Sequence, residues 1–277
     1  MNRRTYILVL LLVSMITVFG QDQNGTYSFL NSTNSARVAA LGGTSIPIYD
    51  SDIQLTTYNP SLINSDIDNN MALSYVDYYR DINFGTVQYG KTFEKAGSFV
   101  GTLQFHNYGR FYYAEENGYQ DGSTFTVSDY MFNVGWGRML NDNWTIGANL
   151  KFAGIQYENS SAFALAVDVA GTYKTSDGWC LSLTARNIGY ELYKNYEGDH
   201  SKLPFRMQLG MSKKLEHLPF TFIVVYDNLQ KWNLSYNDPL DLEGNYDPLS
   251  GQIVEKSKID KFAKNFFSHF VFAGEMN

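Results

Sequence analysis

Residues 143–157 constrain the fold of this chain more than any other segment. The even positions carry Trp144, Ile146, Ala148, Leu150 and Phe152, whereas the odd positions carry Thr145, Gly147, Asn149 and Lys151. A period of two puts successive side chains on opposite faces of an extended strand. The segment is also longer than the usual soluble strand of roughly five or six residues. It therefore predicts a long strand with one apolar face, with Trp144 and Tyr157 in the aromatic girdles at the two edges of a membrane.

Similar strand-like segments recur along the chain at steady spacing. They cover residues 71–79, 82–93, 97–108, 125–137, 143–157, 162–174, 179–189, 205–213, 220–230 and 267–275. Turn-forming residues separate nearly all of them, and no long amphipathic helix intervenes. This pattern excludes βαβ crossovers and favours an antiparallel meander. The alternation is blurred in residues 82–93 and 220–230, which indicates bulges or contact with another segment.

Two all-β folds fit these strands, a transmembrane antiparallel β-barrel and a soluble β-sandwich. Aromatic residues make up 16% of the chain, yet its mean hydropathy is only −0.28. That combination suits surfaces on which apolar and polar residues alternate one by one. The strands are long and carry Trp, Tyr and Phe at their ends, which a sandwich does not need. We therefore predict the membrane barrel.

The first residues of the chain predict export. Arg3 and Arg4 precede an apolar run at residues 6–19, and the small residue Gly20 ends that run. We assign residues 1–20 to a signal peptide, which predicts a protein of the outer membrane of a Gram-negative bacterium. The single Cys180 excludes an intramolecular disulfide. A net charge of −7 without a basic stripe argues against a nucleic-acid partner.

Residues 21–66 differ in pattern from the barrel region, which we assign to residues 67–277. Residues 35–43 form an Ala-rich piece that predicts a helical turn ended by Gly42. We interpret residues 21–66 as a lead and a plug or first-strand segment inside the barrel mouth. Near the other end, residues 256–267 predict a short amphipathic helix that caps the barrel rim or contacts the membrane.

Three charged residues on polar strand faces predict a row across the barrel wall. A hairpin that is symmetric about residues 158–161 sets Lys151 opposite Asp168, and a three-residue hairpin at residues 176–178 sets Asp168 opposite Arg186. The row should face the lumen, because a charge facing lipid costs about 2–4 kcal/mol at the bilayer midplane. It has two possible roles, a structural ion network that fixes the register or a contact for a selected molecule.

The sequence contains no recognisable catalytic motif. His106, His200, His217 and His269 lack metal-ligand spacing, and no nucleophile elbow, P-loop or dinucleotide motif occurs. An outer-membrane lipase would present Ser and His to the lipid, whereas His106, Ser98 and Ser128 fall on the polar face. We therefore predict a non-enzymatic protein with no metal and no cofactor.

Several segments, taken in order, resemble the PorQ family of the type IX secretion system of Bacteroidota. They lie at residues 27–31, 35–43, 59–62, 107–109, 186–189, 203–205, 217–220 and 229–232. Within them, the motif of Leu41, Gly42 and Gly43 followed by Asn59 and Pro60 is also similar to the wider group of PorV and FadL-like barrels.

The resemblance implies a FadL-like barrel of about fourteen strands with an N-terminal plug. It also implies a non-enzymatic place in the attachment complex, where such a barrel holds PorZ at the outer surface beside the PorU sortase and PorV. The implied surroundings are outer-membrane lipid and anionic lipopolysaccharide. Because the chain stops at Asn277 without a terminal aromatic residue, we expect the last strands to be missing from it. A FadL-like channel for hydrophobic small molecules is the alternative function.

Overall fold

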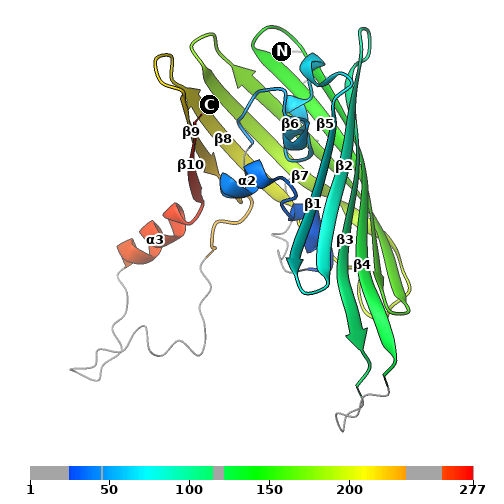
Figure 1. Cartoon of the computed structure of the whole chain (residues 1–277). Coiled ribbons are helices and arrows are strands. Elements are labelled where there is room, and N and C mark those ends of the chain that lie inside the picture. Colours follow the sequence, from blue (N-terminus) through cyan, green and yellow to red (C-terminus); the bar gives the residue numbers. More distant parts are fainter. Residues whose placement is uncertain (1–24, 45, 115–121, 235–257, 277) are drawn as a thin grey trace, which may run out of the picture.

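The computed structural model describes residues 25–44, 46–114, 122–234 and 258–276. Ten strands form one sheet in which each pairs antiparallel with its neighbours in sequence (Figure 1). The strands are β1 (Met71–Tyr79), β2 (Ile82–Phe93), β3 (Gly97–Tyr112), β4 (Thr124–Met139), β5 (Trp144–Tyr157), β6 (Ser160–Lys174), β7 (Trp179–Lys194), β8 (Arg206–Lys214), β9 (Phe220–Tyr226) and β10 (Phe270–Met276). The predicted all-β antiparallel meander is therefore confirmed.

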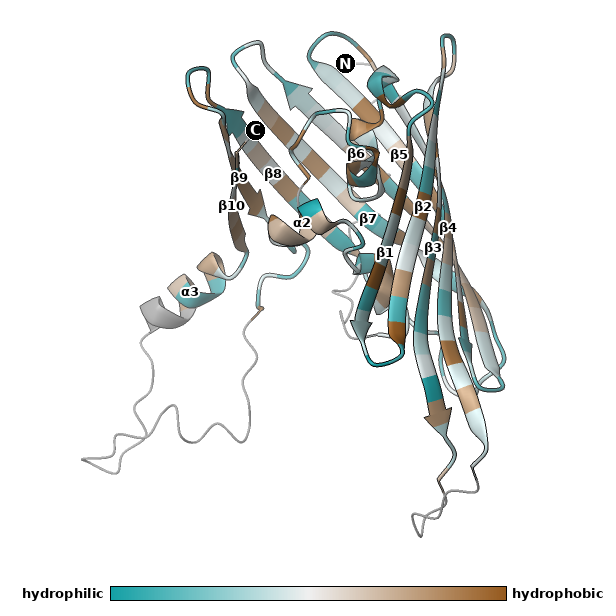
Figure 2. Ribbon diagram, viewed as in Figure 1, coloured by the Kyte–Doolittle hydropathy of each residue, from teal (hydrophilic) through white to brown (hydrophobic). Residues whose placement is uncertain are grey.

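The two faces of the sheet differ in the way that the alternation predicts. On β5, Thr145, Asn149 and Lys151 are buried on the inner face, whereas Trp144 and Leu150 are exposed on the outer face. Hydrophobic and hydrophilic bands accordingly alternate along the strands (Figure 2). In the described residues a single sheet carries all ten strands, so the fold is not a two-sheet sandwich.

Strand bounds follow the predicted ones closely, with corrections at the ends. β3 and β7 run further than predicted, to Tyr112 and Lys194, while β9 already stops at Tyr226.

The assignment of Tyr157 to an aromatic girdle is wrong. As an odd-numbered residue of β5 it lies on the inner face, where it packs against an apolar cluster that includes Tyr27. Only Trp144 keeps the exposed position that a girdle requires.

The N-terminal segment, by which we mean the described part of residues 25–70, lies against the inner face of the sheet (Figure 1). It consists of short helices and contains no strand; these are η1 (Ser28–Asn31), α2 (Ala36–Ala40), η2 (Ile53–Thr57), η3 (Pro60–Leu62) and η4 (Ser65–Ile67). A Cβ atom on Gly147 would lie 2.1 Å from the carbonyl oxygen of Pro60. Only glycine permits so close an approach of two backbones, so η3 lies directly on the wall. The predicted signal peptide, residues 1–20, falls outside the described residues.

The connections between strands are short at one end of the sheet and longer at the other. The short turns cover residues 94–96, 140–143, 175–178 and 215–219. The opposite end, which we call the long-loop end, carries residues 113–123, 195–205 and 227–269 besides the tight turns 80–81 and 158–159. Helix α3 (Lys258–Phe267) belongs to this end and confirms the predicted helix over its described part. In the described residues β1 and β10 are the two edges of the sheet, and the wall is not closed between them.

Within the described ranges, no helix has the length and apolar character needed to cross a membrane.

Candidate functional site

The three charged residues singled out in the sequence lie together on the inner face. Lys151 comes from β5, Asp168 from β6 and Arg186 from β7, and all three side chains are buried. The Lys151 Nζ lies 2.7 Å from Asp168 Oδ2. We call Lys151, Asp168, Arg186 and the adjacent Asn187 the wall cluster.

Asp168 is the centre of the wall cluster, because both of its oxygens accept hydrogen bonds. Oδ2 accepts from Lys151 and from Asn149 Nδ2 at 3.2 Å, and Oδ1 accepts the backbone N–H of Asn187 at 2.7 Å. Lys151 also donates to Asn187 Oδ1 at 2.9 Å. The charges of Lys151 and Asp168 thus compensate each other within the wall, as buried charges require.

The predicted register between β5 and β6 is wrong by two residues. Asp168 pairs with Asn149, and Lys151 pairs with Ala166. The reason is the turn, which is confined to Glu158 and Asn159 and begins with Glu158 in the left-handed region at φ +53°. Because the slip is an even number of residues, both side chains keep the inner face and meet diagonally.

The predicted pairing of Asp168 with Arg186 is also corrected by the structure. Between Lys174 and Val169 the register is the predicted one, but it shifts between Val169 and Val167. At this bulge, Arg186 and Asn187 of β7 lie opposite the single residue Asp168 of β6. Asn187 has φ +57°. The bulge turns the Asn187 N–H toward Asp168, so Asp168 binds this backbone group instead of the Arg186 guanidinium.

Arg186 points to the N-terminal segment. One guanidinium nitrogen lies 3.4 Å from the carbonyl oxygen of Leu30, and the guanidinium carbon lies 5.4 Å from the ring centre of Tyr58. Asn187 Nδ2 donates to Asn31 Oδ1 at 2.9 Å. The wall cluster therefore holds three strands and the segment that lies on them in one connected network.

Asn59 and Pro60 of the sequence motif fasten the N-terminal segment to β6. The Asn59 side chain accepts from the backbone N–H of Ser61 at 3.0 Å and donates to the Ile46 carbonyl at 2.7 Å. The Ser61 hydroxyl lies 2.6 Å from the hydroxyl of Thr172 on β6. Pro60 is the first residue of η3, where its missing N–H leaves no unpaired donor. The motif is thus a docking element between segment and wall.

Leu41, Gly42 and Gly43 end α2 beside the last strand. Both glycines have positive φ angles, +86° and +76°, and the Gly43 N–H donates to the Val38 carbonyl at 2.8 Å. This arrangement confirms the predicted helical turn ended by Gly42. A Cβ atom on Gly42 would lie 2.7 Å from Val271 Cγ1 of β10, so the glycine also permits close contact with the sheet.

A second ion cluster joins the N-terminal segment to β10, and no sequence pattern indicated it. Arg37 contacts Glu275 through two nitrogens at 2.7 and 2.8 Å, Asp52 at 3.0 Å and Asp50 at 2.7 Å. The hydrogen bonds with Glu275 raise the pKa of Arg37 above its ordinary value, although burial acts in the opposite direction. We call these four residues the rim cluster. Glu275 lies 238 positions from Arg37, so no local spacing could predict their contact.

A third polar group, also not predicted, lies where η1 meets the connection between β7 and β8. The buried Glu191 carboxylate accepts from the Tyr27 hydroxyl at 2.9 Å, the Tyr196 hydroxyl at 2.8 Å and the Ser201 backbone N–H at 2.9 Å. Burial, followed by the contact with Glu191, raises the pKa of Tyr27 above its ordinary value. The group holds residues 195–205 against the start of the N-terminal segment.

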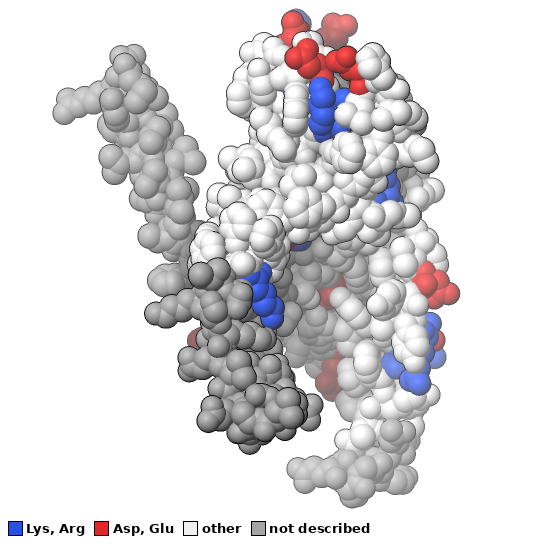
Figure 3. Space-filling view, turned by 90° about the vertical axis from the view of Figure 1, so that its left-hand side faces the viewer, with Lys and Arg blue, Asp and Glu red and all other residues white. Residues whose placement is uncertain are grey.

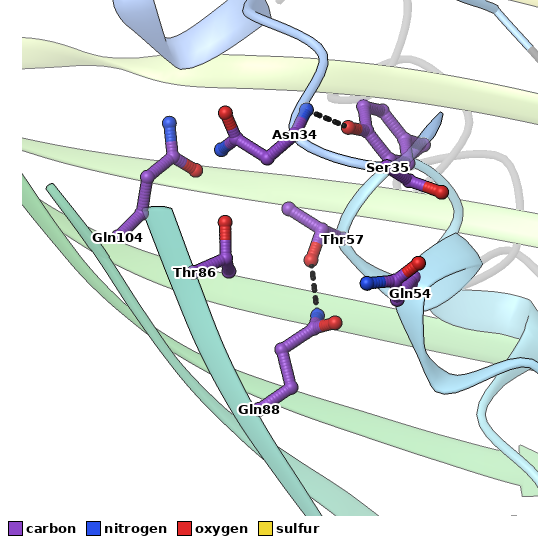
Figure 4. A pocket seen from close by; sticks show the side chains of 8 residues that line it. Asn34, Ser35, Gln54, Thr57, Thr86, Gln88 and Gln104 are labelled. Atoms are coloured by element: carbon purple, nitrogen blue, oxygen red, sulfur yellow. Dashed lines mark hydrogen bonds between the residues drawn. The ribbon is translucent and has the colours of Figure 1, made fainter. Parts of the chain in front are cut away.

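Spaces between the N-terminal segment and the wall are small or polar. One, of about 10 Å³, is lined by Asn34, Thr57, Thr86, Gln88 and Gln104 and has room for a single water molecule (Figure 4). A half-open space of about 230 Å³ lies beside the rim cluster, with Lys174, Lys214 and Cys180 in its lining. Tyr49 also lines it, and burial raises the pKa of this residue to about 12.

His106, the histidine weighed for an outer-membrane lipase, lies between the wall and the N-terminal segment. His106 is buried on the inner face, stacked on Phe84 at 5.0 Å between ring centres, and its Nε2 lies 3.1 Å from Ser32 Oγ. That hydroxyl donates to the Phe29 carbonyl at 2.7 Å, so its proton is not directed to the histidine. Among the described residues, no group of three or more His, Cys, Asp and Glu side chains is placed to hold a metal ion.

The sequence matches no protein-family model and no curated protein.

Proposed function

We propose that this chain is an outer-membrane β-barrel protein and a non-enzymatic component of the type IX secretion attachment complex. In this role it anchors a PorZ-like surface protein beside PorU and PorV. The observation that carries the membrane location is the outer face of the sheet. Leu103 pairs with Phe132, Phe132 pairs with Phe152, and Leu183 pairs with Leu209, so apolar side chains adjoin from strand to strand.

An apolar surface of this extent favours lipid as its surroundings. Exposed large apolar residues occur on the outer face of every strand from β1 to β10. A soluble monomer rarely exposes contiguous apolar patches larger than a few hundred Å². On the side shown in Figure 3, acidic and basic residues gather near the top and again nearer the bottom, and the surface between them is largely uncharged. The buried wall cluster fits the same location, since its charges lie away from the outer face.

The arrangement of the loops supports an orientation and a place for the partner. Outer-membrane barrels have short turns on the periplasmic side and longer loops on the extracellular side. The described parts of the connections from β3 to β4, β7 to β8 and β9 to β10 then lie on the outside of the cell. A PorZ-like partner would bind there, near the anionic lipopolysaccharide. The specific role in type IX secretion rests on the sequence resemblance, whose motif residues Gly42 and Asn59 have defined positions in the docked N-terminal segment.

Isolation of the native complex tests this proposal. The chain, tagged in a loop at residues 115–121, is purified from outer membranes in mild detergent, and co-purified proteins are identified. We expect PorZ-like, PorU-like and PorV-like proteins. Recovery of the chain from outer membranes without any of them would count against the secretion role, and its absence from that fraction would count against the membrane location. A tag in the turn at residues 215–219 is the matched control for loop interference.

The inner face does not favour the alternative of a channel for hydrophobic small molecules. Such a channel needs an apolar path, whereas Gln88 and Gln104 line the smaller of the two spaces and Lys174, Lys214 and the rim cluster residues Arg37, Asp50 and Glu275 line the larger one. Growth of a deletion strain on long-chain fatty acids distinguishes the two functions, because only a channel would make growth depend on this chain.

A further inference from the structure

The connection between β9 and β10 carries a series of aromatic rings outside the barrel wall. Phe262 and Phe266 of α3 stack at 6.2 Å, Phe266 lies 5.1 Å from Phe270, and Trp232 lies 6.0 Å from Phe262, all between ring centres. Helix α3 projects from β10 away from β1 and the N-terminal segment (Figure 1).

Two buried side chains fix this arrangement. Asn265 accepts the Leu234 N–H at 2.9 Å and donates to the Trp232 carbonyl at 2.5 Å. The His269 ring nitrogens lie 2.8 Å from the Asp227 carbonyl and 3.1 Å from the Trp232 carbonyl. Asn265 of α3 and His269, which follows the helix, thus both contact the backbone carbonyl of Trp232. These contacts fix the position of Trp232 beside α3, so the aromatic rings form one surface.

This surface continues the outer face of the last two strands. Phe262 and Trp232 are 56% and 58% exposed, and Phe272 of β10 and Phe222 of β9 are 69% and 53% exposed. Phe270 links the two parts, because its ring lies 5.9 Å from Phe272 as well as next to Phe266. The same surroundings must therefore contact both the outer face of β9 and β10 and these rings.

The charged residues near the aromatic rings indicate what covers these rings. Lys231 adjoins Trp232 in sequence, and Lys264 lies in the last turn of α3, in a chain of net charge −7. Helical spacing puts Phe262, Ala263 and Phe266 on one face. A helix with an apolar face and lysines beside it is the type that lies in a membrane interface and interacts with anionic headgroups.

We propose that α3 and Trp232 form an interfacial collar that lies in the outer leaflet of the membrane. The rings of Phe262, Phe267 and Trp232 enter the acyl boundary, and Lys231 and Lys264 interact with lipid phosphates. The collar holds the β9–β10 edge at a fixed depth in the membrane. This inference rests on the proposed membrane location, but not on the role in secretion.

Fluorescence quenching from the lipid side tests the collar. Single cysteines are introduced as Phe262→Cys, Lys264→Cys and Leu150→Cys in the Cys180→Ser chain, labelled with an environment-sensitive dye and reconstituted in vesicles containing phosphatidylglycerol. Phospholipids brominated near the headgroup act as quencher. We expect roughly twofold stronger lipid quenching at 262 than at 264, as for the two faces of an interfacial helix. Iodide in the water should show the reverse order.

The position at 150 separates the two proposals. Leu150 lies on the exposed outer face of β5, so its label should be quenched by phospholipids brominated deeper in the chain. Lipid quenching at 150 together with equal iodide access at 262 and 264 would overturn the collar alone. Loss of lipid quenching at 150 would overturn the membrane location itself. Protection of 262 from both quenchers would assign the face to a protein partner and would likewise overturn a lipid collar.

Discussion

The wall cluster and the rim cluster are both networks of opposite charges, but they differ in burial and in what they connect. In the wall cluster Lys151 and Asp168 are fully buried, and they link consecutive strands. In the rim cluster the side chains of Arg37, Asp50, Asp52 and Glu275 keep between 18% and 34% of their surface exposed. There the contact joins residues that are 238 positions apart.

This difference in burial determines what the loss of one partner should cost. A buried charge whose partner is removed has no water to replace it, so the penalty is large. At the rim, water reaches the carboxylates and offsets part of the loss. We therefore infer that the wall cluster fixes the strand register and the bulge at Arg186, whereas the rim cluster controls how firmly β10 is held to the N-terminal segment.

The largest expected effect is that of Lys151→Met. The substitution keeps an apolar stem of similar length but leaves Asp168 charged and buried without the ion-pair partner that lies 2.7 Å away in the parent chain. We expect the free energy of unfolding to fall by about 3–5 kcal/mol. Urea titration of the folded chain in detergent micelles or vesicles measures it.

The control for this prediction is the double variant Lys151→Met with Asp168→Asn. The amide has no charge to compensate, and its oxygen can still accept the Asn187 N–H. We expect the double variant to recover most of the lost stability. If the single and double variants were equally unstable, the charge of Asp168 would not be the cause, and the comparison of the clusters by burial would fail.

The next effect in size is that of Arg37→Gln. It leaves three carboxylates close together without their shared cation, and we expect a loss of about 1–3 kcal/mol. Because these groups are partly exposed, 0.5 M salt should reduce the difference between variant and parent. The same salt should leave the Lys151→Met difference nearly unchanged. An equal salt response for both variants would remove the distinction between the clusters.

The sequence predicted the strands well because their signals are local. Alternation and turn residues depend on neighbours along the chain, and the bounds of β1 and β2 agree with the prediction at both ends. The face of Lys151 was also predictable, since a two-residue error in register does not change the face. Membrane location, the PorQ resemblance and the secretion role remain predictions.

What the sequence could not predict depends on backbone detail or on distant partners. The left-handed conformation of Glu158 shortens the turn between β5 and β6, and an Asn at φ +57° produces the bulge in β7. Neither residue is a glycine, so the sequence alone does not indicate a left-handed backbone conformation at either position. The contacts of Arg37 with Glu275 and of Tyr27 with Glu191 connect residues more than 150 positions apart. They exist only once the N-terminal segment lies on the wall.

A smaller effect should appear at Cys180, which is buried at the half-open space beside Arg37. In the folded chain a maleimide should react slowly with this thiol, because reaction requires local opening. Arg37→Gln loosens the contact with β10 and should speed labelling of Cys180 about tenfold. This corresponds to a decrease of about 1.4 kcal/mol in the free energy of local opening. Mass spectrometry of the intact protein gives the rates. Glu275→Gln, which keeps Asp50 and Asp52 on Arg37, should give a smaller increase.

The smallest effect is expected at Asp68, whose carboxylate is near the rim in the turn before β1. The Thr92 N–H donates to Asp68 Oδ1 at 2.7 Å, and Lys91 lies 3.2 Å from the same oxygen. These contacts, the Thr92 N–H foremost, lower the pKa of Asp68 below its ordinary value of 3.8. A lowered pKa in the folded state means that the stabilisation is fully present above that ordinary value and is lost as the pH falls through the folded value.

Asp68→Asn should therefore flatten the acid end of the stability curve measured by urea titration at successive pH values. Lys91→Met should retain most of the acid dependence, because the backbone N–H remains. If Lys91→Met flattened the curve as much as Asp68→Asn, the ion pair and not the backbone contact would dominate, and this exposed site would behave as a third ion cluster.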